Sequence, residues 1–467
     1  MDSGDTAWVL TSAALVLFMT PGLALFYGGL VRSKNVLGTM MHSIAAIGVV
    51  SILWVLIGYT LAFGPDHGLL IGGLDHAGFA GVGAEPAEIA PTVPHTSFAM
   101  FQMMFAIITP ALIAGAFAER VRFRGYLLFV AIWSLVVYAP LAHWVWGGGF
   151  LGVAGIGAID FAGGTVVHMA AGASALAAAI FIGRRAGYPG GVFVPHNVPM
   201  VILGAAILWF GWFGFNAGSA LAAGGLASSA FVATHLGAAA AMIGWLVPER
   251  LRHGKATTIG AATGAVAGLV AITPASGYVG PLPAIAIGLA AGAVCFLAVE
   301  LKPRLGYDDA LDAVGVHLVG GLVGALLTGV FASLAINPAG AEGGLAQIGR
   351  QAAASGITLG FAFGATWAIL WVVDRAVGLR MSEEDEEAGA DLALHGELAY
   401  LFRERDRSPG RAPSDLTEGE LTAIRERLVL EAAAKVLDAM RAPDPVPRAP
   451  DSVPGAPDAA EDAPRQH

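Results

Sequence analysis

The chain has 467 residues, of which 56% are hydrophobic and 13% are charged, and its mean hydropathy is +0.69. No soluble core is large enough to bury so much apolar surface, so the composition excludes a soluble globular protein and predicts an all-α polytopic membrane protein. The formal net charge of −10 argues against nucleic acid as a partner, and the single cysteine excludes a disulfide framework and any CxxC metal site.

Charge-free stretches predict the membrane spans, because a helix that crosses the hydrocarbon layer needs ~20 mostly apolar residues. Seven stretches each fit one span, and they are Thr6–Val31, Asn35–Pro65, Ile89–Ala118, Gly125–Ile159, Phe161–Gly183, Ala313–Ala341 and Gln351–Val373. Two longer stretches, Ala186–Pro248 and Ala256–Val299, must each turn back once. The sequence therefore predicts eleven transmembrane helices.

Basic residues predict the orientation of these helices, because they accumulate in cytoplasmic loops. Twelve of the thirteen basic residues before Arg375 follow odd-numbered spans, namely Arg32, Lys34, Arg120, Arg122, Arg124, Arg184, Arg185, Arg250, Arg252, Lys255, Lys302 and Arg304. Only Arg350 falls on the other side. We therefore expect the N-terminus outside, without a cleaved leader, and the C-terminus inside as a cytosolic tail.

Small residues at helical spacing predict close packing between helices. Two such series are Gly260/Gly264/Gly268 and Gly356/Gly360/Gly364. Apolar neighbours surround the one cysteine, Cys295, which is expected to be a packing residue.

Two histidines inside predicted spans are the first candidates for function, because ionisable groups at membrane depth are rare and costly. His168 lies early in the fifth span and His317 early in the tenth, and each has a glycine four residues later. The fifth and tenth spans run in opposite directions, so the pattern predicts a five-plus-five inverted repeat whose halves meet in mid-membrane. One such histidine alone could equally bond a neighbouring carbonyl, but two in matched positions favour function.

A histidine pair that shares a hydrogen bond would leave its outer nitrogens free to line a narrow path, which suits a small hydrogen-bonding solute or a proton. Asp160 and Asp312 each precede one of these helices, where a carboxylate can cap free N–H groups, and capping is the role expected for both. No HExxH, GxSxG or Walker A pattern occurs, so neither an enzyme nor a metal or cofactor site is predicted.

Several strings in order along the chain resemble the ammonium transporter (Amt/Rhesus) family. They are Tyr27–Asn35, Ala118–Arg120, His143–Gly149, Asp160–His168, Gly211–Ser219, Thr273–Tyr278, Gly315–His317, Gly378–Arg380 and Leu394–Tyr400. The resemblance extends over roughly residues 5 to 400, and so many long strings in one order are highly specific.

The resemblance implies a homotrimer in the cell membrane, here predicted to be a bacterial inner membrane, with one pore in each protomer. It also implies roles for individual side chains: Trp146, Ser219 and Phe105 in an outer recognition site, Phe105 and Phe215 as a gate, His168 and His317 in the pore, Trp212 and Thr273 in the pore wall, and Asp160 as a support of the outer site.

The resemblance implies ammonium as the substrate, with methylammonium as a substitute. Aromatic faces attract such a cation by ~0.5 to 2 kcal/mol. A charge at the bilayer centre costs several kcal/mol, so the expected sequence is outer binding, loss of a proton, and passage of ammonia with or without that proton.

The tail departs from the family. We expect a membrane domain over residues 1–374, a family-like cytoplasmic segment over 375–400, and an extension over 401–467 without a recognised counterpart. The extension is predicted to form a helix over about 414–442, behind a cap at Ser414 or Thr417, and then to be disordered. A solvated helix is the simpler interpretation, and a docking module is the other. The family suggests PII-type nitrogen signal proteins as partners at the cytoplasmic face.

Two alternative functions stay open at this point. The protein could be an ammonium sensor that signals through its tail, although no output domain follows the membrane body. It could also be a Rhesus-type channel for neutral gas, but the residues at positions 146 and 219 favour a member that recognises a cation.

Overall fold

The computed structural model describes residues 1–191, 193–400, 417–419, 421–422 and 425, and the chain divides into two compact units, Met1–Leu401 and Phe402–His467. The helix predicted over 414–442 and the disordered end predicted after it lie outside the described residues, apart from six positions between 417 and 425. Within the described residues, the first unit contains every helix that could cross a membrane.

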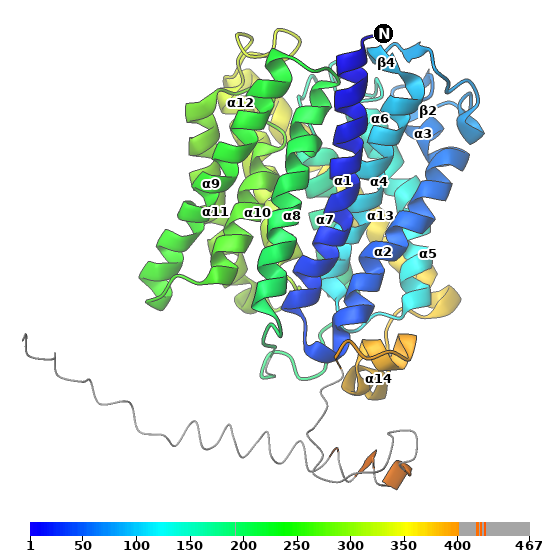
Figure 1. Ribbon diagram of the computed structural model, residues 1–467, viewed down its shortest axis with the longest axis vertical. Coiled ribbons are helices and arrows are strands. Elements are labelled where there is room, and N and C mark those ends of the chain that lie inside the picture. The colour runs from blue at the N-terminus through cyan, green and yellow to red at the C-terminus, as the bar shows by residue number, and fades with distance from the viewer. Residues whose placement is uncertain (192, 401–416, 420, 423–424, 426–467) are drawn as a thin grey trace, which may run out of the picture. The chain divides into compact units, whose positions relative to one another are not determined.

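Eleven helical spans form the first unit, and four of them contain a π-helical turn (Figure 1). The spans are α1 (Ser3–Leu30), α2 (Val36–Leu53) leading through Trp54–Gly58 into α3 (Tyr59–Phe63), α4 (His95–Phe117), α5 (Phe123–Trp133) leading through Ser134–Tyr138 into α6 (Ala139–Val145), Gly164–Met169 leading into α7 (Ala170–Ile182), α8 (Val198–Ala217), α9 (Gly225–His253), α10 (Thr258–Ile272), α11 (Pro281–Leu305), Val314–Leu318 leading into α12 (Val319–Phe331), and α13 (Leu345–Val377). Ten are long and apolar enough to cross a membrane, and α10 is shorter at 15 residues. The predicted all-α polytopic fold is confirmed.

Short elements join the spans at both ends of the unit. Two small antiparallel sheets pair β1 (Asp66–His67) with β2 (Ile71–Gly72) and β3 (Pro86–Ala87) with β4 (Ala90–Pro94). The remaining short elements are the 3₁₀ turns Ser33–Asn35, Ala77–Phe79 and Gly218–Ala220, helix α14 (Glu383–Ala388) and the π-helical turn Asp391–His395.

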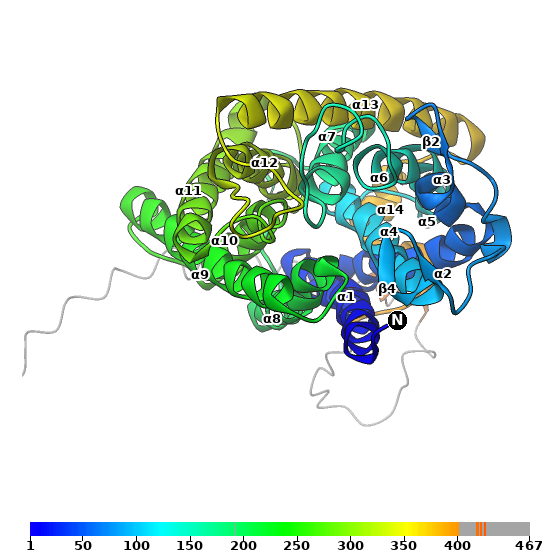
Figure 2. The ribbon, with the colours of Figure 1, turned by 90° about the horizontal axis from the view of Figure 1, so that it is seen from above.

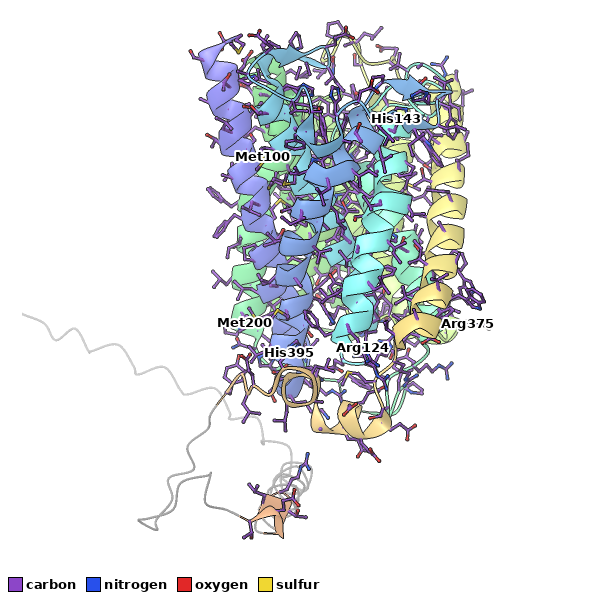
Figure 3. All side chains as sticks on the ribbon, turned by 90° about the vertical axis from the view of Figure 1, so that its right-hand side faces the viewer. Met100, Arg124, His143, Met200, Arg375 and His395 are labelled. Carbon is purple, nitrogen blue, oxygen red and sulfur yellow. The ribbon has the colours of Figure 1, made fainter. Side chains whose placement is uncertain are left out.

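The loops that follow odd-numbered spans meet at one end of the unit. Arg32 pairs with Glu119 at 2.8 Å, and Arg185 pairs with Asp308 at 2.8 Å, which ties together the loops after α1, α4, α7 and α11. Helix α14 lies at this end, opposite the N-terminus (Figure 1). Figure 3 shows Arg124, Arg375 and His395 at the same end and His143 near the other. This grouping agrees with the one-sided placement of basic residues in the sequence.

Apolar composition overestimates three of the spans. The tenth was expected to run to Ala341, but its helix ends at Phe331 and a loop follows. The fourth was expected to run to Ile159, but the helix ends at Val145 and a loop follows. Residues of this loop such as Leu151, which is 0% exposed, are buried in the bundle, so the loop has the composition of a helix. The third was expected from Ile89 but begins at His95, because the preceding residues form the β3–β4 hairpin.

The first glycine series packs as predicted and the second does not. A Cβ on Gly264 would lie 2.6 Å from the Cβ of Trp245, and one on Gly268 would lie 2.4 Å from the Cβ of Ala241, so α10 lies directly against α9. The prediction for Gly356, Gly360 and Gly364 is wrong, because a Cβ on any of them would meet nothing within 4 Å. Helix α13 runs along one side of the unit and turns this face away from it (Figure 2). Cys295 is buried, as predicted.

Close contact between α1 and α8 joins the two halves of the bundle. A Cβ on Gly204 would lie 2.3 Å from the backbone nitrogen of Phe26, and one on Gly29 would lie 2.8 Å from that of Val201. Such distances leave no room for a side chain, so glycine is required for this approach.

Candidate functional site

The two histidines lie side by side in the middle of the bundle. Their ring centroids are 5.4 Å apart, their planes differ by 17°, and their exposed fractions are 1% for His168 and 4% for His317. Each ring belongs to a π-helical turn, a local irregularity that often marks functional sites. The glycine four residues after each histidine makes the approach possible, since a Cβ on Gly172 would lie 2.3 Å from the nitrogen of Leu318 and one on Gly321 would lie 2.9 Å from the oxygen of Gly164.

The hydrogen bond expected between the imidazoles is not formed. Both ring nitrogens of His168 and Nδ1 of His317 are buried without a hydrogen-bond partner. The rings that contact His168 belong to Trp212, at 5.3 Å, and Phe215, at 5.8 Å, and their faces offer no strong acceptor. Buried polar atoms without partners are uncommon in proteins, so these nitrogens are available to a polar guest.

A narrow cavity runs beside the pair. Its volume is about 50 Å³, enough for a few molecules the size of water, each of which needs at least ~10 Å³ on this measure. Both histidines, Trp212 and Phe215 line it together with aliphatic side chains. Asp312 lines it as well.

Aromatic rings in contact with one another lie at the Phe215 end of the cavity. The Phe105 and Phe215 centroids are 4.3 Å apart, and Phe105 meets Trp146 edge to face at 6.2 Å and 82°. With Phe215 next to His168, the rings form a continuous series from Trp146 to the histidine pair. The Phe105 and Phe215 rings thus lie between Trp146 and His168.

An outer pocket of about 330 Å³ lies next to these rings, on the side of Trp146. Trp146, Asp160 and Ser219 line it. The Ser219 hydroxyl donates to the carbonyl of Phe215 at 2.8 Å, so its oxygen lone pairs can accept a hydrogen bond from a ligand. Two of the three residues predicted for the outer site, Trp146 and Ser219, thus line one pocket together with Asp160, its predicted support. The third, Phe105, does not line this pocket and contacts the ring of Trp146.

Asp160 organises both the pocket and the histidine helix. Its carboxylate accepts hydrogen bonds from the backbone nitrogens of Gly163, Gly164, Thr165 and Val166 and from the Thr165 hydroxyl. Its main-chain oxygen accepts from the indole nitrogen of Trp146 at 2.8 Å. The capping role predicted for Asp160 agrees with these contacts, and they also fix the indole.

Two further polar residues complete the walls. The indole nitrogen of Trp212 donates to the Thr273 hydroxyl at 2.8 Å, which holds the ring against His168. Gln102 also lines the outer pocket, and its Oε1 is buried without a partner. Sequence reasoning missed Gln102, although a lone amide inside an apolar span is a detectable signal.

The capping role predicted for Asp312 is wrong. Asp309 caps the His317 helix instead, accepting from the backbone nitrogens of Val314 at 2.8 Å and Ala313 at 3.2 Å. Asp312 has a left-handed φ of 61° and directs its carboxylate to Lys302 in a short ion pair. Asp309 precedes His317 by the same interval as Asp160 precedes His168, so the spacing could have identified it.

Buried charges at the inner end have shifted titrations. Burial raises the pKa of Asp309 to about 6, although the Lys302 charge partly opposes this. Burial also disfavours ionisation of Asp308 and Glu119, but their contacts with Arg185 and Arg32 outweigh it and leave both carboxyl pKa values below normal. The inner loops are therefore joined by ionised pairs, and the Asp309 carboxyl near them keeps its proton to a higher pH than a free carboxyl does.

Residues 375–400 pack on these inner loops. The Asp391 carboxylate accepts from the backbone nitrogen of Gly38 at 2.8 Å, and the Asn35 side chain accepts from that of Ala390 at 2.7 Å. Arg380 pairs with Glu386 at 3.0 Å. The segment is thus fixed to the start of the second span and the turn before it.

A helical bundle with an aromatic outer pocket, two packed phenylalanine rings and a narrow cavity beside two imidazoles is a membrane transporter for a small polar solute. The family model described as Ammonium Transporter Family matches residues 7–400. The chain belongs to this family, and the protein is a transporter and not an enzyme.

Individual relatives agree with this assignment. The chain is 51% identical over 405 residues to the ammonium transporter of Bacillus subtilis (strain 168), covering 86% of this chain and 99% of the relative. It is 50% identical over 459 residues to the ammonium transporter of Mycobacterium bovis, covering 91% of this chain and 96% of the relative. The crystal structure of Saccharomyces cerevisiae Mep2 superimposes with a TM-score of 0.78 at 36% identity, covering 82% of this chain and 89% of Mep2.

Proposed function

We propose that this ammonium transporter binds ammonium in the outer pocket, removes its proton there, and conducts ammonia past His168 and His317, with or without the proton. The observation that carries the proposal is the position of the two imidazoles, which lie beside a narrow cavity under a closed aromatic gate. A passage of this kind admits a small neutral molecule far more easily than an ion.

The outer pocket suits a cation that carries hydrogen-bond donors. The faces of Trp146 and Phe105 attract a desolvated cation by ~0.5 to 2 kcal/mol. The Ser219 oxygen can accept one N–H because its own proton is donated to Phe215. The Asp160 carboxylate is occupied by the helix cap, so it contributes negative potential and does not contact the cation directly.

Loss of the proton supplies selectivity against potassium. Potassium gains from the aromatic faces but has no N–H to donate and no proton to release, so it stays charged at the gate. Ammonia enters the cavity as a neutral molecule and can donate to, or accept from, imidazole nitrogens that have no protein partner.

The test is ammonium-evoked current and methylammonium uptake in proteoliposomes that contain the purified full-length chain. Replacing His317 by leucine removes an imidazole from the lining of the cavity. We therefore expect transport to fall about tenfold or more, or the ratio of current to uptake to change. Unchanged uptake and unchanged current would contradict the role of the histidine pair.

The same measurements separate the alternatives. A sensor would bind ammonium without measurable flux, and a neutral gas channel would give uptake without current. A chain that ends at residue 400 is the control, since flux that persists without the extension assigns transport to the membrane unit.

The family suggests an oligomeric state, a membrane and a partner for this protein. The protein is proposed to form a homotrimer in a bacterial inner membrane, with a PII-type signal protein as a partner at the cytoplasmic face, where residues 375–400 and the inner loops form one surface. Native mass measurement in detergent tests the trimer. Co-purification with a PII protein, with and without residues 401–467, tests the partner and the role of the extension.

A further inference from the structure

One buried glutamine of α13 bonds to the loop that carries the outer pocket. Gln351 is 2% exposed. Its Oε1 accepts from the backbone nitrogen of Ile159 at 2.8 Å, and its Nε2 donates to the backbone oxygen of the same residue at 2.8 Å. The amide therefore pairs with Ile159 as a neighbouring β-strand would, and this double contact fixes which end of the amide is nitrogen.

Ile159 is the residue directly before Asp160. The Asp160 carboxylate caps the helix of His168, and its main-chain oxygen holds the Trp146 indole. The backbone position of Ile159 thus determines where the ring of the outer pocket lies.

The loop has little regular structure of its own at this point. Gly157 and Gly163, on either side of Ile159, have left-handed φ values of 77° and 120°. Such backbone is easily bent, so a fixed partner from outside the loop is needed to hold one conformation.

The same amide also contacts the second half of the repeat. Gln351 Nε2 donates to the Ala325 oxygen on α12 at 3.2 Å, and α12 continues the π-helical turn of His317. One side chain therefore connects α13, the outer loop and the second histidine helix. It is fully hydrogen-bonded, so an apolar replacement leaves buried backbone groups without partners.

We propose that Gln351 is a positioning residue of the outer pocket, which sets the affinity for ammonium by fixing Ile159 and, through Asp160, the ring of Trp146. This inference rests on the proposed function of the pocket. Gln351 does not touch the substrate, and its effect is on recognition and not on passage through the cavity.

The first test is the variant Gln351→Met, which has a similar volume and no hydrogen bonds, in methylammonium uptake by proteoliposomes of the full-length chain. We expect KM to rise about tenfold or more, because the Ile159 N–H and C=O are left buried and unpaired, while the maximal rate stays within about twofold. Ser355→Ala is the matched control: Ser355 lies one turn further along α13, is 1% exposed, and has no partner for its hydroxyl. A KM that stays within twofold, or a lower maximal rate at unchanged KM, would overturn the inference.

A second variant, Gln351→Glu, keeps the test decisive if the methionine variant is poorly folded. A protonated carboxyl group has the shape of the amide and can both accept from and donate to Ile159, whereas an ionised one repels the Ile159 oxygen. The ratio of variant to wild-type KM should therefore fall several-fold as the pH is lowered from 8 to 5.5. The same ratio at every pH would overturn the proposed contact.

Combining Gln351→Met with Trp146→Leu separates this inference from the function on which it rests. If Gln351 acts through Trp146, its substitution should raise KM clearly less in the Trp146→Leu background than in the wild type. If the two substitutions raise KM by factors that multiply in full in the double variant, the inference is overturned and the proposed role of the outer pocket still stands. An unchanged KM in Trp146→Leu alone would overturn the proposed pocket itself, and the inference with it.

Discussion

The helices of His168 and His317 are built alike, but their N-terminal caps differ. Asp160 accepts five hydrogen bonds, including one from the Thr165 hydroxyl, and its main chain holds Trp146. Asp309 accepts two, and its main-chain oxygen receives the Lys302 ammonium at 2.8 Å.

Because the two halves are inverted, these caps lie at opposite ends of the pore. The outer cap is joined to an aromatic ring that can bind a cation, and the inner cap is joined to a lysine and a second carboxylate. Two similar helices thus differ in their surroundings, with an aromatic pocket at one cap and a buried lysine at the other.

The largest contrast is expected between Asp160→Ala and Asp309→Ala. Loss of the Asp160 carboxylate leaves five donors without their acceptor. It also frees the backbone at residue 160, whose main-chain oxygen holds the Trp146 indole, so methylammonium uptake should fall about 100-fold or more. Loss of Asp309 removes two bonds far from the outer pocket, and uptake should fall no more than about tenfold. Equal losses would show that the caps do not divide recognition from exit. Purified yield and monodispersity are the controls for folding.

A smaller contrast is expected between the two glycines that let the histidine helices meet. In Gly172→Ala the new Cβ would lie 2.3 Å from backbone, which cannot move aside, so we expect a loss of about 3 kcal/mol. In Gly321→Ala the nearest atoms are 2.9 Å away and one belongs to the flexible Met169 side chain, so a loss of about 1 kcal/mol is expected. Thermal unfolding in detergent measures both, and the reverse order would contradict the packing described for the pair.

The smallest effect concerns the pH dependence of stability. The folded protein holds the Asp309 proton up to a pKa of about 6, above the value of 3.8 for a free carboxyl, so this group favours folding at low pH and the benefit is lost as the pH rises through 6. Between pH 7 and pH 5 the wild type should gain about 1 kcal/mol relative to Asp309→Asn, whose amide does not ionise.

The comparison with Asp309→Asn separates Asp309 from the other carboxyls. Burial also raises the pKa of Asp391, but this group is the same in the wild type and in the variant. Asp308 and Glu119 have pKa values lowered by their arginine partners, so they weaken the fold only as the pH falls below their normal range. Equal pH dependence in the wild type and in Asp309→Asn would contradict the raised pKa of Asp309.

Much of the fold follows from where charges are missing. Spans bounded by Arg32, Arg120 or Arg184 were placed correctly because each arginine ends an apolar helix. The end of the fourth span was placed wrongly, because a buried loop and a buried helix have the same composition. Only tertiary structure shows that residues 146–163 cover the outer end of the pore.

The site was predictable where a motif carried it. The histidine pair and the residues around Trp146 were found from strings and matched positions, and the structure brings them together. Gln102 and Gln351 were missed because the sequence does not show which partner a polar residue in an apolar helix meets. Asp309, in the loop before the His317 helix, was missed because Asp312 lies nearer the start of that helix. Asp309 and not Asp312 caps the His317 helix. Proximity to a helix start is therefore weaker evidence for a cap than equal spacing from the two histidines.

The glycine face of α13 makes this chain well suited to site-specific labelling. Cys295 is the only thiol in the sequence and is 0% exposed, so it is shielded from added reagents. A cysteine introduced at Gly356 or Gly360 would stand in open space away from the pore and would be the single reactive thiol. One spin label or fluorophore at either position could then report distances between copies of the chain without altering the conducting path.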